Sequence, residues 1–167
     1  MIMASAQKML EQKEYREFTV IDLVADSGVN RNTFYYHFRD MEALVVELAK
    51  KGIDRSFASW KGNAAEKMYS LIDAILKNRV SIMHVYSSAY RTDFDLGLDA
   101  VCEYLAAKLY AAHDELQTKT EYEKACWCLL VKGCSYGLFC DWLSKGLDDD
   151  SREKLCTIYD ELLNSKE

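Results

Sequence analysis

Apolar residues recur three and four positions apart through most of the chain, which is the spacing of helices with one buried face. The clearest stripe lies near the C-terminus, at Leu155, Ile158, Tyr159, Leu162 and Leu163. Stretches of this kind predict about nine helices, over residues 3–12, 19–27, 31–38, 40–60, 68–75, 80–90, 94–113, 120–145 and 150–164.

Local signals mark several of the predicted helix ends. An acid three positions after a capping residue occurs at three helix starts: Thr19–Asp22, Thr120–Glu123 and Asp150–Glu153. Gly28 can take the left-handed conformation of a tight helix exit, and Asn30 can cap the helix that follows. Within the second helix, the spacing predicts that the inward-facing residues are Ile21, Val24 and Ala25.

The composition agrees with a helical chain. The 167 residues include no Pro and only seven Gly, and both residue types disfavour helix interiors. We therefore expect an all-α fold. The pair Gly62-Asn63 marks a break near the boundary between a small N-terminal part and a larger C-terminal part.

The overall charge and the cysteines narrow the class of protein. A formal net charge of −6 is a mild argument against nucleic-acid binding, because phosphate contacts need Lys and Arg. The six Cys form no C-x-x-C pair, and we expect buried, reduced thiols and no metal site. The N-terminus lacks a signal-peptide pattern, and no stretch approaches the roughly 20 apolar residues of a membrane span. We expect a soluble, cytoplasmic protein without cofactor or membrane association.

The most specific signal lies in the segment Phe18–Leu44. Two short helices joined by a Gly-containing turn form the helix-turn-helix unit, whose second helix enters the major groove of DNA. The side chains available on that helix are Arg31, Asn32, Thr33, Tyr35, Tyr36 and His37. Phe34 and Phe38 lie four positions apart and can anchor it to the core. The spacing alone also fits other α-helical proteins.

The same segment resembles the TetR family of transcriptional regulators. The matching residues are Thr19, Ile21 to Ala25, Gly28-Val29, Thr33 to Tyr35, His37-Phe38, Asp40, Glu42 and Leu44. The resemblance implies a three-helix DNA-binding domain over residues 1–50 and a helical ligand-binding and dimerisation domain over residues 51–167. It also implies, in most members, repression relieved by a small molecule. The C-terminal part is weakly similar to the DhaS-type branch, which includes regulators of dihydroxyacetone kinase genes.

The resemblance further implies a set of DNA-contacting residues. Those expected to reach base edges and nearby phosphates are Arg31, Asn32 and Thr33. Those expected to contact phosphates and thymine methyl groups are Tyr35, Tyr36 and His37. Thr19 begins a helix whose N-terminus would point at a phosphate. Two features depart from the family: Met41 replaces a frequent Lys, and residues 1–50 hold six Lys and Arg against eight acids.

The C-terminal part predicts a ligand cavity and a dimer. The residues expected to line the cavity are Met83, Tyr86, Tyr90, Tyr104 and Trp127, although such side chains can equally be ordinary core. Gly133 and Gly137 lie four apart in an apolar helix, so a second helix can approach closely, from the same subunit or from another. The resemblance favours a homodimer, with an interface at Gly133, Gly137, Ile158 and Leu162.

These observations predict a ligand-responsive, DNA-binding transcriptional regulator that acts as a repressor. Its expected partners are double-stranded operator DNA, a second copy of the chain and a small-molecule effector. An enzyme is a poor interpretation, because the chain has no recognisable nucleophile motif, H-x-x-x-H pattern or Gly-rich phosphate loop. The acidic N-terminal part and Met41 leave one alternative open. That alternative is a protein on the same scaffold that binds other proteins or small molecules and not DNA.

Overall fold

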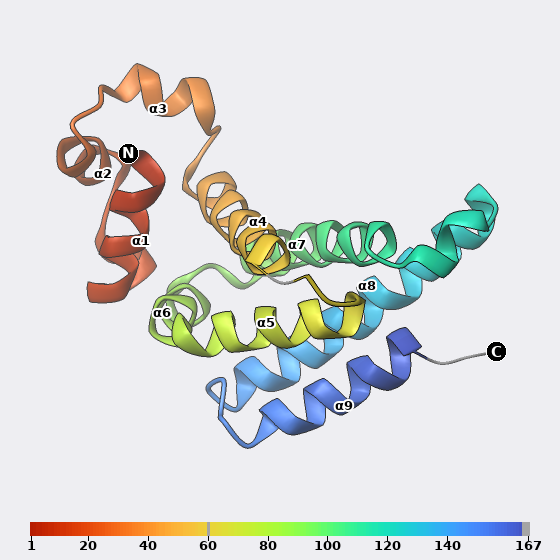
Figure 1. Cartoon of the computed structure of the whole chain (residues 1–167). Helices are drawn as coiled ribbons and strands as arrows, with labels where there is room; N and C mark the ends of the chain where they lie inside the picture. The colour runs from red at the N-terminus through yellow and green to blue at the C-terminus, as the bar shows by residue number, and fades with distance from the viewer. Residues whose placement is uncertain (60, 165–167) are drawn as a thin grey trace.

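The chain folds into helices joined by short connections (Figure 1). The computed structural model describes residues 1–59 and 61–164, apart from the side chains of residues 114, 115 and 164. The helices of this part are α1 (Ile2–Gln12), α2 (Val20–Ser27), α3 (Arg31–His37), α4 (Met41–Ser59), α5 (Ala64–Lys77), α6 (Arg79–Ser88), α7 (Arg91–Ala111), α8 (Glu121–Ser144) and α9 (Ser151–Asn164). Two 3₁₀ turns that the sequence pattern did not predict are η1 (Tyr15–Glu17) and η2 (Asp114–Thr118). No strand occurs in these residues, so the all-α prediction is confirmed.

Buried apolar side chains form two separate clusters. The smaller cluster comes from α1 to α4 and consists of Ile2, Ala6, Leu23, Phe34 and Leu44. The larger cluster is built from α4, α5, α7, α8 and α9, and Trp142 at 2% exposure is its largest fully buried side chain. Helix α4 contributes Leu44 to the first cluster and Ile53 to the second. We call α1–α3 with the start of α4 the N-terminal unit, and the remainder the C-terminal unit.

The two units touch along α4 and where α6 meets α1 and η1. Helices α1 to α3 form a group of their own at one end of the molecule, and α4 leads from it into the remaining helices (Figure 1). Helix α4 packs against α5 and α7, while α1 packs against α6. The N-terminal unit is therefore held both by its covalent continuation through α4 and by the contact between α1 and α6.

Polar contacts fix the long α4–α7 packing. Asp54 of α4 accepts hydrogen bonds from the Tyr104 hydroxyl at 2.7 Å and from the Lys108 ammonium at 2.6 Å. The bonds from Lys108 and Tyr104 lower the pKa of Asp54, so the carboxylate stays charged. Further along, a Cβ on Gly97 would lie 3.2 Å from Val46 Cγ2. The absence of a side chain there lets the two helices approach closely.

The inward face of α2 differs from the prediction. Ile21 is 63% exposed and Ala25 is exposed, whereas Leu23 is fully buried and Val24 is half-buried. The buried line follows Val20, Leu23, Val24 and Ser27, which is the predicted spacing shifted by one residue. An eight-residue helix with apolar residues almost all round offers two similar faces, and its neighbours decide which one is covered.

Two other local predictions also change. The residue that caps α9 is Asp148 and not Asp150, since its carboxylate accepts from the Ser151 N–H at 2.6 Å and from the Ser151 hydroxyl at 3.0 Å. Of the six cysteines, only Cys102 is buried, and Cys126 is exposed.

The predicted end of α4 at Trp60 lies outside the described residues. Within the described part of the chain, no helix is both long and apolar enough to cross a membrane.

Candidate nucleic-acid interface

Three local interactions fix the start of α2, the end of α2 and the start of α3. The Thr19 hydroxyl donates to Asp22 Oδ2 at 2.8 Å, and the Thr19 N–H does the same, which closes the predicted capping box. Gly28 ends α2 with φ of 68°, in the left-handed region that glycine adopts most easily. Asn30 Oδ1 then accepts from the Thr33 N–H at 2.8 Å and so begins α3.

Helix α3 is held by one face and exposed on the others. Phe34 is fully buried, and its ring lies 5.6 Å from that of Phe38 and edge-on to that of Tyr35. The side chains that remain accessible are Arg31, Asn32, Tyr35, Tyr36 and His37, with Tyr36 85% exposed. A short helix anchored by an aromatic residue, with polar groups on its outer side, has the shape needed to enter a major groove.

The exposed side chains of α3 also support one another. Arg31 Nη2 donates to the Tyr35 hydroxyl at 3.4 Å, and its guanidinium lies 5.5 Å from the centre of that ring. The rings of Tyr36 and His37 meet edge to face at 5.0 Å. Helix α3 contains no acidic residue. The five side chains thus form one surface that carries positive charge and hydrogen-bond donors.

Two of the predicted DNA contacts are already used in caps. Thr33 is half-buried, and its hydroxyl donates to Asn30 Oδ1 at 3.1 Å. Thr19 is exposed at the start of α2, but its partner Asp22 places a carboxylate at the same helix end. Hydrogen bonds from Thr19 lower the pKa of Asp22, so this carboxylate is charged at neutral pH and repels a nearby phosphate. Helix α2 is therefore a weaker anion site than an uncharged helix N-terminus.

One candidate contact was missed by the sequence reasoning. Arg39 follows α3 directly, and its side chain is 86% exposed while it forms an ion pair with Asp40. Asp40 also caps α4 by accepting from the Ala43 N–H at 2.8 Å. An Arg immediately after the groove-facing helix is a signal that a scan for cations could have found. Met41, where the family often has Lys, is half-buried and packs against the smaller core cluster.

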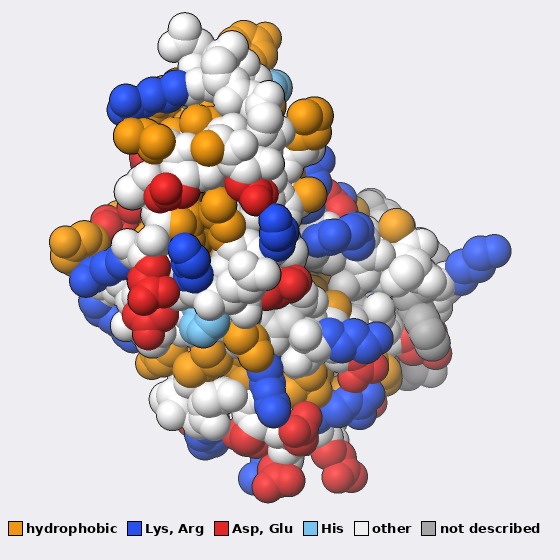
Figure 2. Space-filling view, turned by 90° about the vertical axis from the view of Figure 1, so that its left-hand side faces the viewer, with side chains coloured by type: hydrophobic (Ala, Val, Ile, Leu, Met, Phe, Trp, Pro, Cys, Tyr) orange, Lys and Arg blue, Asp and Glu red, His pale blue; other side chains and the backbone are white. Residues whose placement is uncertain are grey.

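The surface around α3 carries few charges of either sign. In Figure 2, the end of the molecule formed by α3 is mostly white and orange, with blue at its edge, and most acidic side chains on this face lie lower. Of the nearby cations, Lys8 pairs with Asp26 at 2.9 Å. The N-terminal unit thus offers a small cationic surface on α3, with few charged side chains around it.

A cavity of about 280 Å³ lies within the C-terminal unit and reaches the N-terminal unit. None of the five residues predicted to line a ligand cavity lines it. Aromatic residues that do are Tyr15, Phe94, Phe139, Trp142 and Tyr159, among aliphatic side chains from α4 to α9. The structure therefore places the five predicted residues outside this cavity, for reasons that differ between them.

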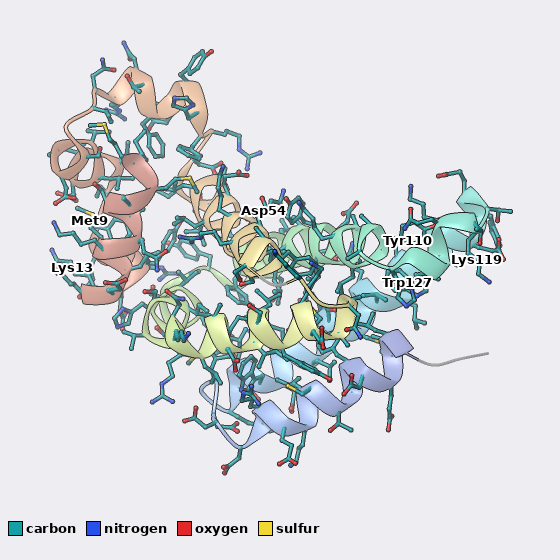
Figure 3. All side chains as sticks on the ribbon, in the orientation of Figure 1. Met9, Lys13, Asp54, Tyr110, Lys119 and Trp127 are labelled. Carbon is teal, nitrogen blue, oxygen red and sulfur yellow. The ribbon has the colours of Figure 1, made fainter. Side chains whose placement is uncertain are left out.

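Each of the five predicted residues has another environment. Tyr90 is 67% exposed, with the Arg16 guanidinium 3.9 Å from the centre of its ring, and Tyr104 turns to Asp54 on the outside of the α4–α7 contact. Trp127 packs on Tyr110 with ring centres 5.7 Å apart, far from the N-terminal unit (Figure 3). Met83 and Tyr86 are half-buried against the larger core cluster.

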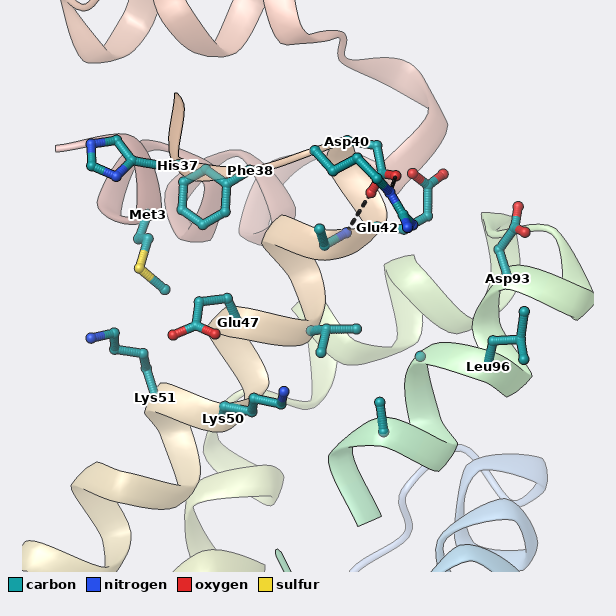
Figure 4. Close-up of a pocket in the computed structure, with 15 residues that line it drawn as sticks. Met3, His37, Phe38, Asp40, Glu42, Glu47, Lys50, Lys51, Asp93 and Leu96 are labelled. Atoms are coloured by element: carbon teal, nitrogen blue, oxygen red, sulfur yellow. Dashed lines mark hydrogen bonds and ion pairs between the residues drawn. The ribbon is translucent and has the colours of Figure 1, made fainter. Parts of the chain in front are cut away.

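A groove of about 880 Å³ lies on the outside, between the start of α4 and helix α7 (Figure 4). Its lining mixes acids and bases, such as Glu47 with Lys50 and Lys51. The groove and the cavity share Glu42, Val46, Asp93 and Gly97 as lining residues. The α4–α7 contact at these positions therefore separates the cavity from the outside.

The outer face of α8 is apolar and uncovered. Its exposed residues include Tyr122, Cys126, Leu129, Leu130, Gly133 and Gly137, and we call this set the α8 outer face. A Cβ on Gly133 or Gly137 would meet no atom within 4 Å. On α9, Ile158 is 39% exposed and Leu162 is half-buried. The predicted interface glycines thus face open space and are not used for packing within the subunit.

Fold and site together define a helix-turn-helix unit, α2 and α3, with a separate helical unit behind it. Residues 2–48 match the family model described as "Bacterial regulatory proteins, tetR family". This match covers the N-terminal unit, which is less than a third of the chain, so the similarity to the TetR family is shown for that unit. No group of three or more His, Cys, Asp or Glu side chains that could hold a metal ion is found in the described residues.

Relatives with known names match over part of the chain. The chain is 39% identical over 67 residues to the HTH-type transcriptional regulator EthR of Mycolicibacterium smegmatis (strain ATCC 700084 / mc(2)155), which is 40% of this chain and 30% of that protein. It is 31% identical over 55 residues to EthR of Mycobacterium tuberculosis (strain ATCC 25618 / H37Rv), covering 33% of this chain and 26% of that protein. The matches therefore span less than a third of the length of these relatives.

Among solved structures, the Dihydroxyacetone kinase operon activator DhaS has a similar fold over the whole chain. The two align with a TM-score of 0.65 over 98% of this chain and 92% of that chain, at 16% sequence identity. At this identity the comparison shows the fold, over both the N-terminal and the C-terminal unit.

Proposed function

We propose that this protein is a ligand-responsive transcriptional regulator that binds operator DNA through α3. The single observation that carries the proposal is the arrangement of α3, with Phe34 fully buried and Arg31, Asn32, Tyr36 and His37 exposed. In the major groove, Arg31 is suited to guanine O6 and N7, and Asn32 to adenine N6 and N7. The match of residues 2–48 to the TetR family supports the same function.

We further propose that residues 1–50 form the DNA-binding domain and residues 51–167 the ligand-binding and dimerisation domain. The two separate core clusters support this division, since each unit has its own buried apolar residues. Operator binding would place the protein in the cytoplasm. No catalytic role is proposed, because regulators of this family act through DNA and ligand binding.

The proposed dimer uses the α8 outer face together with α9. Contiguous exposed apolar residues on one helix are typical of a surface that another protein covers. Gly133 and Gly137 would let the equivalent helix of a second copy approach closely. A two-fold dimer would present two copies of α3 to half-sites about one helical turn apart, or a little more.

Repression is the proposed direction of regulation. A dimer bound across a promoter blocks polymerase without needing any further contact, and ligand binding in the cavity would release it. A reporter gene under the promoter flanking the protein's own gene tests this proposal. Deleting the regulator should raise expression, and a fall in expression would instead indicate an activator.

The alternative function is a protein that uses this scaffold without binding DNA. The observation that favours it is the charge of the N-terminal unit, where Lys8 and Arg39 are both paired with acids and Asp22 lies at the start of α2. Its cationic surface is confined to α3. DNA-binding measurements separate the two functions.

The test is fluorescence anisotropy with a labelled duplex from the DNA flanking the protein's own gene. A scrambled duplex of equal length and composition serves as the competitor, over a series of salt concentrations. We expect tighter binding to the native duplex and a loss of this preference in Arg31→Ala. The control variant is Arg79→Ala, which removes another exposed arginine, paired with Asp149 in the C-terminal unit. Equal binding to both duplexes, unchanged by Arg31→Ala, would support the alternative.

A further inference from the structure

The cavity has walls that suit an apolar molecule. Aliphatic residues from α1 and from α4 to α9 line it, among them Ile72, Leu98, Val101, Leu105 and Leu138, and Phe139 and Trp142 add aromatic surface. Burying apolar ligand surface against such walls is favourable without any directional contact. The volume of about 280 Å³ bounds the size of the ligand. At about 30 Å³ per water in the liquid, this volume equals roughly nine waters, or a molecule of about ten heavy atoms.

Two hydroxyl groups in the wall, those of Tyr15 and Ser81, lack a hydrogen-bond partner among the described residues. Ser81 of α6 is 6% exposed, and its hydroxyl makes no hydrogen bond to any residue that the structure describes. A buried hydroxyl without a partner costs free energy, which a ligand oxygen at this position would recover. Ser81 thus marks the point in the cavity where a hydrogen-bonding atom of the ligand is favoured.

A second polar group lies at the α8–α9 side of the cavity. Ser135 and Tyr159 are 2% and 4% exposed, and the Tyr159 hydroxyl donates to Ser135 Oγ at 2.8 Å. Burial raises the pKa of Tyr159 to about 12, so this hydroxyl stays protonated at neutral pH. These two neutral hydroxyls can form a hydrogen bond with a hydroxyl or carbonyl oxygen of a ligand. They provide no charge to balance an ionic ligand.

The charges around the cavity oppose an anionic ligand. The acids Glu42 and Asp93 belong to the wall shared with the outer groove, so a molecule that enters there passes two carboxylates. The basic residue of the lining, Arg55, is itself exposed, and its Nε donates to the Lys51 carbonyl at 3.3 Å. A carboxylate or phosphate in the apolar interior would lose its hydration without gaining a cationic partner.

We propose that the cavity binds an uncharged, mostly apolar molecule of about ten heavy atoms, with a hydroxyl or carbonyl oxygen that meets Ser81 Oγ. The inference rests on the proposed function only in taking this molecule as the effector. The cavity is also lined by Gln7 and Leu10 of α1, so the ligand lies against the helix that joins the N-terminal unit to α6. Its position explains how an apolar molecule can act on the DNA-facing helices.

The test compares three probes of equal chain length: 1-octanol, octanoate and octylamine. Binding to the full chain is measured by calorimetry and by the rise in Tm that a ligand of the folded state produces. We expect 1-octanol to bind and to raise Tm, and octanoate to bind at least about tenfold more weakly because of its uncompensated charge. Octanoate or octylamine binding as tightly as 1-octanol would overturn the uncharged class.

Three variants locate the bound molecule. Ser81→Ala should weaken the binding of 1-octanol about three- to tenfold, as expected for the loss of one hydrogen bond. The binding of toluene, which has no hydroxyl, should stay unchanged. The control, Ser88→Ala, removes another buried serine of α6 whose hydroxyl already donates to the His84 carbonyl outside the cavity lining. Gly52→Leu places a side chain into the cavity from a position where a Cβ meets no atom within 4 Å. It should abolish binding while the helix stays folded.

These outcomes stand apart from the DNA experiment. The probes are measured without DNA, so a failure of operator binding leaves the ligand result intact, and the converse also holds. Undiminished binding of 1-octanol to Gly52→Leu would show that it binds elsewhere and would overturn the proposal. Absence of binding by all three probes would overturn it as well.

Discussion

The imidazole Nδ1 of His84 lies 2.7 Å from the carbonyl oxygen of Leu10, and its N–H donates to that oxygen. The bond joins α6 of the C-terminal unit to the last turn of α1, where helix carbonyls have no partner within the helix. Gln7 Nε2 donates to Asn78 Oδ1 at 2.9 Å in the same contact. Because the cavity is lined by Gln7, Leu10 and Asn78, this junction connects a bound ligand with the N-terminal unit.

Replacing His84 with Ala should loosen α1 without unfolding the protein. The loss of one hydrogen bond to a buried carbonyl should lower the free energy of unfolding by about 1 kcal/mol. Hydrogen exchange should become faster in residues 2–12. The matched control is His113→Ala, which removes a bond of 2.7 Å from His113 Nε2 to the Leu163 carbonyl at the other end of the molecule. Equal exchange of residues 2–12 in the two variants would contradict a local role for His84.

The residues of α3 should divide into two kinds of DNA contact. Replacing Asn32 with Ala should cost about 1–3 kcal/mol of binding and relax the preference at one base position, because a bidentate base contact is lost. Replacing Tyr36 with Ala should weaken binding to all duplexes about equally, because a phosphate contact does not depend on the identity of the base. Binding to a library of single-base variants of the operator measures both. A base-specific loss in Tyr36→Ala would reverse the assignment.

The sequence predicted the helix-turn-helix because its signals are local. Each capping residue acts on a partner three or four positions away: this holds for Thr19, Gly28 and Asn30. The inward face of α2 was shifted by one residue, because Val20 to Ala25 are all apolar except Asp22. Only the packing of α1 and α3 against α2 selects the face with Leu23, and no pattern within α2 records it.

The cavity lining depended on contacts between residues far apart in the chain. Tyr104 turns outward because Asp54, fifty positions earlier, accepts its hydroxyl. Tyr90 lies under Arg16, which belongs to the other unit. Whether an aromatic side chain lines a hollow, fills the core or covers the surface is decided by how its helix is rotated against its neighbours. Residue type and helical spacing within one helix do not determine that rotation.

Replacing Gly137 with Trp should weaken the proposed dimer and leave the subunit folded. A Cβ at this position would meet no atom of its own subunit within 4 Å, but the tryptophan ring would hold a second helix away. We expect at least about a tenfold rise in the dimer dissociation constant, as for a disrupted packing contact. Sedimentation measures it, and circular dichroism checks the fold. The control, Leu96→Trp, enlarges a 68% exposed residue of α7 outside the α8 outer face. A monomeric unaltered protein at micromolar concentration would refute the dimer.

Acid should weaken the start of α8. Hydrogen bonds from the Thr120 N–H and hydroxyl lower the pKa of Glu123 from its ordinary 4.5, so the folded chain releases this proton more readily than the unfolded chain. The stability that this cap contributes is fully present above pH 4.5. It is lost as the pH falls through the lowered pKa of Glu123 in the folded chain. Glu123→Gln should reduce this loss in denaturant titrations. Glu121→Gln, in the same first turn, is the control. Equal acid sensitivity in both variants would contradict the role of the cap.

Replacing Met41 with Lys should strengthen DNA binding and make it more sensitive to salt. Met41 begins α4 just after Arg39 and Asp40, and a lysine there can snorkel past the smaller core cluster to reach a phosphate. One added phosphate contact should steepen the slope of log affinity against log salt by about 0.9. Met41→Gln, of similar length but uncharged, separates this effect from the loss of methionine packing. Anisotropy over a salt series measures both variants on the native duplex. Identical slopes for Lys and Gln would show that residue 41 does not face the DNA backbone, and the orientation proposed for α3 in the groove would then have to be abandoned.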